Sequence, residues 1–458
     1  MAVWSEVNRA SINEIDRFDA EYYKPEYIEI SNTLNKINTD KLNSYIDFVQ
    51  CGPFGSTIKN NTYISDGVIV ARPFNVNSCV FEPDNIVYIS EEDVNKKNLS
   101  LYDDKDIFFA RVGDIRVGIL SKTNINKKVT ISPNIIATRL NNKKIYPEFV
   151  VLFFNTMLGH KQIERALKVV AQPTISTELI RKLKLFIPSK QIQEEVSILF
   201  NKSLELKQLS QSLYTQAQEL LERELGLDKL FFDKPLSYEA RLSEVVDSRR
   251  ANAEYFSPTA KCILGKIQTD KTRNISSLFT VVRGRSPSSY SQAGIPVIKT
   301  KSIRVPTFDE NRIDDFVTSA DNFVEICEDD LLLASMGVGS LGRISYVNSI
   351  NSRYIVDGTI RILRKKSSIK EKIAIPTMLF YSTKAGQVLI YRGIVGSTGI
   401  ISLPDDYLHK LPVPYFNDTL CERISELVIK SQNAKIESQQ LLEQAKQRVE
   451  ELIEQAVQ

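Results

Sequence analysis

The sequence has 458 residues, enough for two to four domains, with 42% hydrophobic residues, 25% charged residues and a small net charge of +3, as in a folded protein. Its longest apolar runs are far shorter than a membrane span, and charged residues interrupt the first twenty positions, so neither a membrane segment nor a secretion signal is expected. The five cysteines are irregularly spaced, which argues against disulfides and a zinc site and favours a reducing, cytoplasmic environment.

An internal repeat is the most informative feature of the chain. Four blocks of matching residues recur in the same order, and their offsets drift only as loop insertions would make them drift. The blocks are 17–25 with 250–258, 106–118 with 330–342, Phe153 and Gly159 with Phe380 and Gly386, and Ser176, Leu185 and Pro188 with Ser402, Leu411 and Pro414. The sequence therefore predicts two copies of one domain, related by a pseudo-twofold internal repeat.

Each copy has the same predicted elements in chain order. A short polar helix is followed by short strands between turn residues, such as 68–70 and 297–298. A helix is expected near 147–168 and near 376–392, then a strand that ends at Pro188 or Pro414, then a long helix.

The two long helices carry matching apolar stripes at alternating four- and three-residue steps, with serines filling the same two gaps in each stripe. A 3.5-residue apolar repeat is typical of a coiled-coil seam, so the two helices are expected to pack on each other, and the two copies point in opposite directions if that pair is antiparallel. The alternative is that each helix lies on its own domain. A helix of about 37 residues spans roughly 55 Å, more than one turn of DNA at roughly 34–36 Å. The expected helix-pair residues are Ile192, Val196, Leu199, Leu206, Leu213, Leu220, Leu420, Ile424, Leu427 and Leu441.

The charge is divided between these helices and the rest of the chain. Residues 190–226 carry four Lys or Arg and six Asp or Glu, and residues 416–458 carry five and eight. Removing both segments from the net charge of +3 leaves +8 on the remainder. An anionic partner for the basic regions is one interpretation, and chance unevenness of solvated surfaces is the other.

The sequence resembles the specificity (S) subunits of Type I restriction–modification enzymes. The resemblance rests on residues 17–25, on Cys-Gly-Pro-Phe-Gly-Ser at 51–56, on 106–113, on 187–191 with the long helix that follows, and on weaker forms of these motifs in the second copy. It covers essentially the entire chain. It implies two α/β target recognition domains, 1–188 and 228–414, separated by a pair of long antiparallel coiled-coil helices, 189–227 and 415–458.

The resemblance also implies function and partners. Each recognition domain would bind one half of an asymmetric, bipartite target in double-stranded DNA, in the cytoplasm of a bacterium or archaeon. Two methyltransferase subunits would dock on the helices, and restriction subunits would join them. The chain itself would be non-catalytic and hold no cofactor, with S-adenosylmethionine bound to the methyltransferase subunit.

Two motifs mimic catalytic sites. Residues 337–342 match the Gly-x-Gly-x-x-Gly dinucleotide fingerprint, but the strand-like run 344–347 follows where a helix is needed, so a glycine hairpin is expected in both copies. Asp84 with residues 103–105 resembles a nuclease carboxylate cluster, a pattern that is common by chance. The tetrapeptide of DNA amino-methyltransferases and the phosphate-binding loop are both missing from the sequence, and the two histidines are far apart.

Sequence-specific binding to DNA needs Arg, Lys, Asn, Gln and Ser side chains in a groove and further cations on phosphates. We expect such residues beside turns where loops gather at one edge of each domain. The candidates are Lys59, Arg72, Asn75, Arg111, Arg116, Gln172 and Thr174 in the first copy, and Arg283, Arg285, Lys299, Lys301, Arg304, Arg343, Ser397 and Thr398 in the second. For each one alone, an ordinary solvated side chain is the competing interpretation.

Three functions remain open from the sequence. The first is DNA recognition within a methyltransferase–restriction complex. The second is an adaptor whose two repeated domains bind proteins or glycans on a coiled-coil spacer, although the charge division favours the first. The third is a self-contained nuclease or methyltransferase, which the missing motifs oppose.

Overall fold

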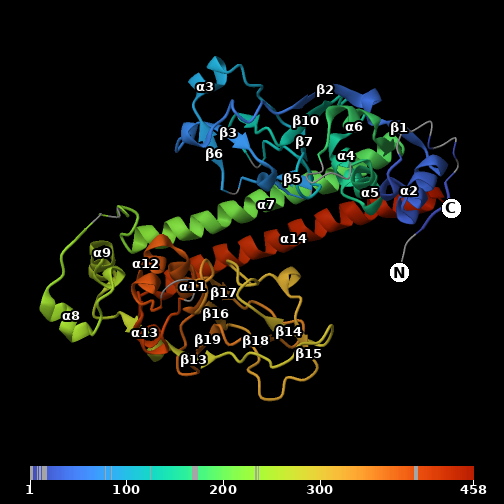
Figure 1. The fold of residues 1–458 in the computed structure, drawn as a ribbon. Helices are drawn as coiled ribbons and strands as arrows, with labels where there is room; N and C mark the ends of the chain where they lie inside the picture. The colour runs from blue at the N-terminus through green and yellow to red at the C-terminus, as the bar shows by residue number, and fades with distance from the viewer. Residues whose placement is uncertain are drawn as a thin grey trace. The chain divides into compact units, whose positions relative to one another are not determined.

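The computed structural model describes residues 4–457 apart from 8, 10–11, 13–17, 78, 84, 124, 168–173, 233–234, 236 and 397–400. Figure 1 shows it as a ribbon coloured along the chain. The structure divides into two units. Unit 1 comprises Met1–Gln208 and Lys435–Gln458, and unit 2 comprises Leu209–Ala434. Unit 1 is therefore assembled from both ends of the sequence, whereas unit 2 is one continuous segment.

The elements of unit 1 are short and numerous. They are η1 (Ala20–Tyr23), α2 (Pro25–Lys36), β1 (Thr39–Lys41), η2 (Leu42–Tyr45), β2 (Ile46–Cys51), η3 (Asn60–Thr62), β3 (Val68–Ala71), η4 (Pro73–Asn75), β4 (Val76–Asn77), β5 (Cys79–Phe81), β6 (Val87–Ile89), α3 (Glu91–Lys96), β7 (Ile107–Ala110), β8 (Val117–Ile119), β9 (Val129–Ile131), β10 (Ile135–Leu140), α4 (Pro147–Phe154), α5 (Met157–Ala166), α6 (Thr177–Lys182) and β11 (Lys184–Phe186). The long helices α7 (Lys190–Glu224) and α14 (Asp418–Val457) each contribute one end.

A six-stranded sheet in the order β2-β10-β7-β8-β5-β4 forms the centre of unit 1. Successive residues of a strand face opposite sides of a sheet, and β7 buries both of its sides. Ile107 and Phe109 lie in the core that α4, α7 and α14 cover, whereas Phe108 lies in a second core under the three-stranded sheet β6-β3-β9. The continuous apolar run of β7 is explained by this burial on two faces.

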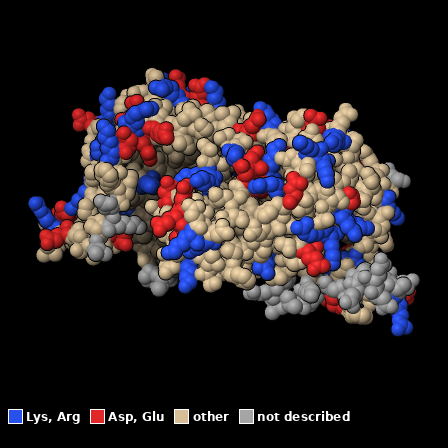
Figure 2. Space-filling model, turned by 90° about the horizontal axis from the view of Figure 1, so that it is seen from above, with Lys and Arg blue, Asp and Glu red and all other residues tan. Residues whose placement is uncertain are grey.

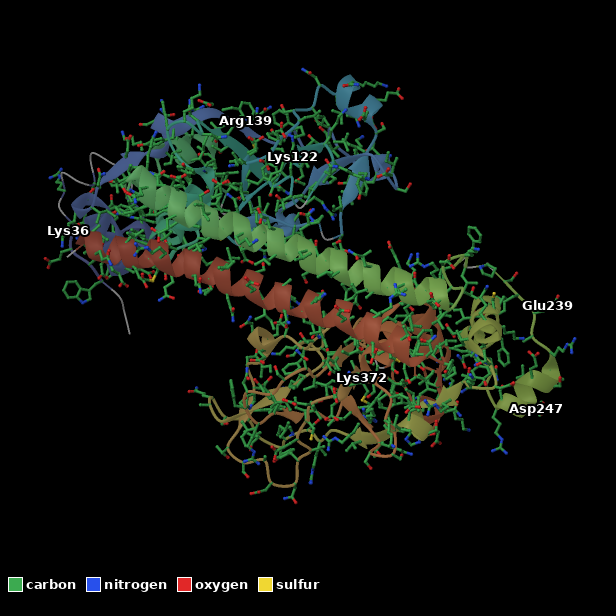
Figure 3. All side chains as sticks on the ribbon, turned by 180° about the vertical axis from the view of Figure 1, so that it is seen from behind. Lys36, Lys122, Arg139, Glu239, Asp247 and Lys372 are labelled. Atoms are coloured by element: carbon green, nitrogen blue, oxygen red, sulfur yellow. The ribbon has the colours of Figure 1, made fainter. Side chains whose placement is uncertain are left out.

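Unit 2 has a comparable set of elements. They are α8 (Leu242–Ser248), η5 (Ala253–Phe256), α9 (Pro258–Ile267), β12 (Arg273–Asn274), α10 (Ile275–Leu278), β13 (Phe279–Arg283), β14 (Ile295–Ile298), η6 (Glu310–Arg312), β15 (Phe316–Val317), β16 (Leu331–Ala334), β17 (Ile344–Tyr346), β18 (Ile355–Val356), β19 (Ile360–Lys365), α11 (Ala374–Ser382), α12 (Lys384–Arg392), α13 (Asp405–Lys410) and β20 (Pro412–Val413). Before α9, Glu239 and Asp247 project from an exposed segment that includes α8 (Figure 3).

The main sheet of unit 2 has the order β13-β19-β16-β17 and is antiparallel throughout. Strand β16 buries both faces in the same way as β7. Leu331 and Leu333 contribute to the core with the helices, and Leu332 contributes to a second core beside the three-stranded sheet β15-β14-β18. The predicted α/β class is thus confirmed.

The packing of the two long helices is also confirmed, and within each unit α7 and α14 run side by side and antiparallel (Figure 1). In unit 1 the Ser438 hydroxyl donates to the carbonyl oxygen of Ser203 at 2.6 Å, and Arg448 lies 3.7 Å from Glu195. As the residue number rises on one helix, it falls on the other. The small serines that fill the gaps of the predicted stripes allow this close approach.

The residues predicted for the helix pair are all buried or half-buried. Several of them face the domain cores and not only the other helix. Val196 lies in the core of unit 1, and Leu220 and Ile424 lie in the core of unit 2. Each helix therefore packs in both units. Helix α14, for example, contributes Ile424 to the core of unit 2 and Ala445 to the core of unit 1.

The sequence alignment of the two copies is wrong by two residues around helices α6 and α13. Leu183 accepts a hydrogen bond from the backbone N–H of Leu42, and Leu411 accepts the same bond from Ile275. Leu183 therefore corresponds to Leu411, at the offset of 228 that the long helices also show, whereas the sequence match had paired Leu411 with Leu185. The error arose because Ser402, Leu411 and Pro414 are identical to Ser176, Leu185 and Pro188, although they lie two positions out of register with them. The pseudo-twofold relation between the copies stays a prediction.

Candidate nucleic-acid interface

Five segments of unit 1 meet at one edge of its main sheet, and together they are called loop cluster 1: residues 51–55, 71–75, 111–116, 132–134 and 174–175. Backbone hydrogen bonds join them: Gly52 N–H donates to Ile135 (2.9 Å), Ser132 to Ala71 (2.8 Å), Arg111 to Asn134 (2.8 Å) and Ile175 to Arg111 (3.2 Å). The turn-flanking residues that the sequence singled out are thereby brought to one edge of the domain.

Gly52 shows how tightly these segments pack. A Cβ atom at this position would lie 2.0 Å from the carbonyl oxygen of Ser132, far inside van der Waals contact. Only glycine permits the strand end β2 to pass this close to the turn before β10. Close packing therefore requires the first glycine of the Cys-Gly-Pro-Phe-Gly-Ser motif. Phe54 of the same motif is exposed beyond the turn.

The predicted DNA-contact residues of unit 1 differ in how free they are. Lys59 is exposed, and its ammonium has no ion-pair partner among the described residues. Arg72 donates to the carbonyl of Asn85, and Arg116 lies 3.0 Å from Asp114. Asn75 is buried and uses its side-chain amide within its own turn, accepting from Arg72 N–H and donating to Glu82.

Two further predicted residues of unit 1 flank the hairpin between β7 and β8. Arg111 is half-buried and donates to the carbonyl of Pro133 at 3.4 Å. Thr174 is exposed and forms a β-bridge with Val112. Gln172 lies outside the described residues. Five of the predicted residues thus lie in loop cluster 1, with Lys59 four residues beyond its first segment.

Unit 2 contains an equivalent arrangement, loop cluster 2, made of residues 284–287, 298–299, 335–343, 357–359 and 402–403. The corresponding backbone hydrogen bonds run from Gly284 to Ile360 (3.1 Å), Asp357 to Ile298 (3.0 Å), Ser335 to Thr359 (2.9 Å) and Leu403 to Ser335 (2.9 Å). Gly284 has the same packing requirement as Gly52, since a Cβ would lie 2.2 Å from the carbonyl oxygen of Asp357. The same geometry recurs although the loop sequences differ.

The cations of loop cluster 2 and its surroundings fall into two groups. Arg283 and Arg285 are exposed at the end of β13, and the guanidinium of Arg283 has no partner among the residues that the structure describes. Lys299 is neutralised by Asp315 at 3.0 Å and also lies 4.0 Å from the centre of the Tyr290 ring. Lys301 is paired with Asp314.

The remaining predicted residues of unit 2 are Arg304, Arg343, Ser397 and Thr398. Arg304 and Arg343 are half-buried, and within the described residues their guanidinium groups donate to backbone carbonyls alone, those of Ile303 (2.8 Å) and Gly339 (2.6 Å). Ser397 and Thr398 lie outside the described residues. The sequence did not identify Arg312, which lies near Arg304, because no motif of the repeat includes it.

The glycine-rich run 337–342 is the hairpin that the sequence predicts. Strands β16 and β17 pair antiparallel on either side of it, and Gly337, Gly339 and Gly342 all have positive φ. The first copy has the same β7–β8 hairpin. Exposed residues mark both tips, Val338 in unit 2 and Asp114 in unit 1.

The acidic residues that mimic a nuclease site have other partners. Asp103 pairs with Lys122 at 2.6 Å, which lowers the pKa of its carboxyl group, and Lys105 pairs with buried Glu148 at 2.8 Å. Asp84 lies outside the described residues. Within the part of the chain that the structure describes, no His, Cys, Asp and Glu group is arranged to hold a metal ion.

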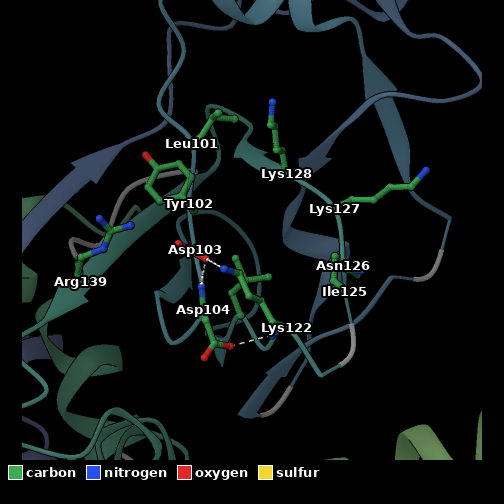
Figure 4. A pocket seen from close by; sticks show the side chains of 11 residues that line it. Leu101, Tyr102, Asp103, Asp104, Lys122, Ile125, Asn126, Lys127, Lys128 and Arg139 are labelled. Carbon is green, nitrogen blue, oxygen red and sulfur yellow. Dashed lines mark hydrogen bonds and ion pairs between the residues drawn. The ribbon is translucent and has the colours of Figure 1, made fainter.

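Asp103 also lines a pocket of about 460 Å³ with several cations at its rim (Figure 4). Each of these cations has an acidic partner: Lys127 pairs with Asp66, Lys128 with Glu91, and Arg139 with Asp106. The pocket therefore has no excess positive charge with which to bind an anion. On the face drawn in Figure 2, basic and acidic side chains are interspersed.

Fold and geometry define a two-unit α/β protein in which each unit presents a cluster of loops with arginine and lysine side chains and packs on a pair of long helices. None of the described helices combines the length and apolar character that crossing a bilayer requires. Neither a protein-family model nor a curated protein matches the chain.

Solved structures of Type I restriction–modification subunits are similar to it. The S subunit from M. genitalium matches with a TM-score of 0.48 and 12% identity, over 92% of this chain and 96% of that one. A chain from a type I R-M system structure concerned with complex assembly matches with a TM-score of 0.32 and 11% identity, over 92% and 97%. The HsdS subunit from Thermoanaerobacter tengcongensis matches with a TM-score of 0.28 and 11% identity, over 92% and 96%.

Proposed function

We propose that the chain is the DNA-sequence specificity subunit of a Type I restriction–modification complex. Each unit binds one half of an asymmetric, bipartite target in double-stranded DNA through its loop cluster. The chain is non-catalytic, acts in the cytoplasm, and docks two methyltransferase subunits together with restriction subunits. Methyl transfer from S-adenosylmethionine takes place on the methyltransferase subunit.

The observation that carries this proposal is the recurrence of one loop geometry with different side chains. Gly52 and Gly284 occupy equivalent close-packed positions, and the same backbone hydrogen bonds join the segments around them. The side chains on this shared frame differ: Arg111 of unit 1 corresponds to Ser335 of unit 2, and Asp114 at one hairpin tip corresponds to Val338 at the other. A conserved frame with variable polar and apolar groups is what reading two unlike half-sites requires.

The charges support DNA over a protein or glycan ligand. Arginine is the residue that makes the commonest specific base contact and also binds phosphates, and both clusters present half-buried or exposed arginines. Arg283 and Lys59 have no partner within the described residues, so their charges are available to a ligand. A glycan site would instead favour clustered exposed aromatic rings.

Binding-site selection tests the proposal directly. The purified chain, alone and with its methyltransferase partner, is incubated with a pool of duplexes of random sequence, and the bound DNA is sequenced. We expect a two-part motif with a fixed spacing, and affinity that falls steeply with salt because phosphates are engaged. Bound DNA without any shared motif would refute sequence recognition.

Two single variants then assign each half of the motif. Arg111→Gln is expected to relax base preference in one half, and Arg283→Gln in the other, with affinity losses of about 1–3 kcal/mol each. A matched control is Arg181→Gln, an exposed residue of α6 whose guanidinium donates to the side-chain oxygen of Asn43. Relaxation of both halves by one variant would contradict the assignment of one half-site to each unit.

A further inference from the structure

The loop between β14 and β15, residues 299–315, carries four Lys or Arg and four Asp or Glu. Lys299 and Lys301, at its start, are neutralised by Asp315 and Asp314 at its end. Buried Ser302 closes the loop from within, since its hydroxyl donates to the carbonyl of Arg312 at 3.0 Å. The two lysines are therefore neutralised within the loop, and its other cations are Arg304 and Arg312.

Two contacts fasten this loop to strand β17. The buried hydroxyl of Ser345 accepts the backbone N–H of Arg304 at 3.0 Å and donates to the carbonyl of the same residue. The backbone N–H of Tyr346 donates to the carbonyl of Pro306 at 2.8 Å. Arg343 lies two residues before Ser345, and alternate residues of a strand share one face. Arg343 and Arg304 are thereby held on the same side of the sheet.

Three guanidinium groups therefore gather with one carboxylate. Arg312 pairs with Asp309 at 2.9 Å, whereas Arg304 and Arg343 donate to backbone carbonyls and have no acidic partner among the residues that the structure describes. Burial together with the nearby charges of Arg312 and Arg343 lowers the pKa of Arg304. Because arginine stays charged at any ordinary pH, this repulsion persists until an anion is bound.

We propose that Arg304, Arg312 and Arg343 form a clamp for a phosphate group of double-stranded DNA. The planar fork of arginine matches phosphate oxygens, and phosphate contacts fix the register of a protein on the duplex. Arg343 also donates to the carbonyl of Gly339, inside the β16–β17 hairpin. A phosphate held there fixes the position of the hairpin tip, at Val338, relative to the bases. This inference rests on the proposed function and adds Arg312 to its site.

Salt-dependent binding of a fluorescein-labelled, mixed-sequence duplex tests the clamp by anisotropy. Arg312→Gln is expected to weaken binding roughly tenfold and to reduce the slope of log affinity against log salt by about 1, the effect of one lost phosphate contact. The control is Arg353→Gln, an exposed arginine of the same unit that Glu325 holds at 2.7 and 3.0 Å. The control should leave both slope and affinity unchanged.

The outcomes separate the clamp from the proposed function. If the wild-type chain binds the duplex and Arg312→Gln and Arg343→Gln both keep its slope, the clamp is wrong and DNA recognition stands. If the wild-type chain binds no duplex with or without its methyltransferase partner, DNA recognition itself is wrong. Equal loss of binding to a polyglutamate chain would assign the three arginines to an acidic protein surface instead. Thermal unfolding of each variant confirms that the arginine, and not the fold, was lost.

Discussion

The hydroxyl of Ser431 on α14 donates a hydrogen bond to the carbonyl oxygen of Ser210 on α7 at 2.7 Å, and the two hydroxyls lie 3.1 Å apart. Both serines are buried. Ser438 makes the corresponding bond to Ser203 in unit 1. Small side chains that satisfy their own polar atoms let the two helix backbones approach, so helix packing here depends on small size as much as on apolar surface.

Leucine at position 431 should therefore destabilise the protein. Ser431→Leu adds bulk to a filled helix interface and removes a hydrogen bond, with an expected loss of about 1–3 kcal/mol in the free energy of unfolding measured in urea. Asn433→Leu, on the exposed side of the same helix, should change it by less than about 0.5 kcal/mol. Equal effects of the two changes would show that position 431 is not tightly packed.

Alanine at Gly284 should disturb loop cluster 2. The new Cβ would lie 2.2 Å from the carbonyl oxygen of Asp357, so the backbone must move, at an expected cost of about 1–3 kcal/mol together with weakened DNA binding. Gly265→Ala provides the control, because nothing lies within 4 Å of its Cβ inside helix α9, and it should stabilise by up to about 1 kcal/mol. Thermal unfolding and the binding assay measure the two effects. If Gly284→Ala binds DNA as tightly as the wild-type chain, loop cluster 2 is not part of the binding site.

The buried carboxylate of Asp106 should be among the most sensitive polar groups of unit 1. It accepts from Arg139 Nε (2.7 Å), Arg139 Nη2 (2.6 Å) and the backbone N–H of Asp103 (2.8 Å). Asp106→Asn is expected to cost about 2–3 kcal/mol in urea unfolding, because an amide can no longer accept all three bonds. Asp114→Asn, at an exposed ion pair with Arg116, should cost under about 0.5 kcal/mol.

Stability should fall in alkaline solution. Burial raises the pKa of Cys79 to about 12 and of Cys421 to about 11, so both thiols stay protonated in the folded state while the unfolded chain ionises near pH 9. The free energy of unfolding should hold steady below pH 9 and then fall by about 1.4 kcal/mol per pH unit for each thiol until its folded-state pKa is reached. Cys79→Ala should flatten the fall, and Cys262→Ala, at an exposed thiol, should not. A urea series from pH 7 to pH 11 checks this, and identical curves for the two variants would contradict it.

The sequence predicted those features whose pattern repeats. The serine gaps of the two stripes and the glycine hairpins occur twice, and both are found in the structure. A 3.5-residue stripe alone could not show that α7 and α14 bury a second, adjacent row, which includes Phe200 and Val449. Helix residues that face a domain follow tertiary packing, which a single period does not encode.

Residue type also failed to separate ligand-facing from structural polar groups. Asn75 fits a DNA contact by chemistry and by its place beside a turn, yet it is buried with its amide used inside that turn. Arg312 belongs to no motif of the repeat, although the loop fold brings its charge near that of Arg304. Both outcomes depend on how a loop closes, through contacts such as that of Ser302 with Arg312, which sequence patterns do not reveal.

Both long helices contribute residues to both units, and this affects how the protein folds while it is being synthesised. Ala445 and Val449, close to the last residue of the sequence, are part of the core that the first half of the chain surrounds. On the ribosome, unit 1 is therefore left with an open apolar surface until translation has passed these positions, whereas unit 2 can close as soon as the start of α14 emerges. The half that is synthesised first is the half that finishes folding last, and a chain stopped before residue 445 exposes that surface to aggregation.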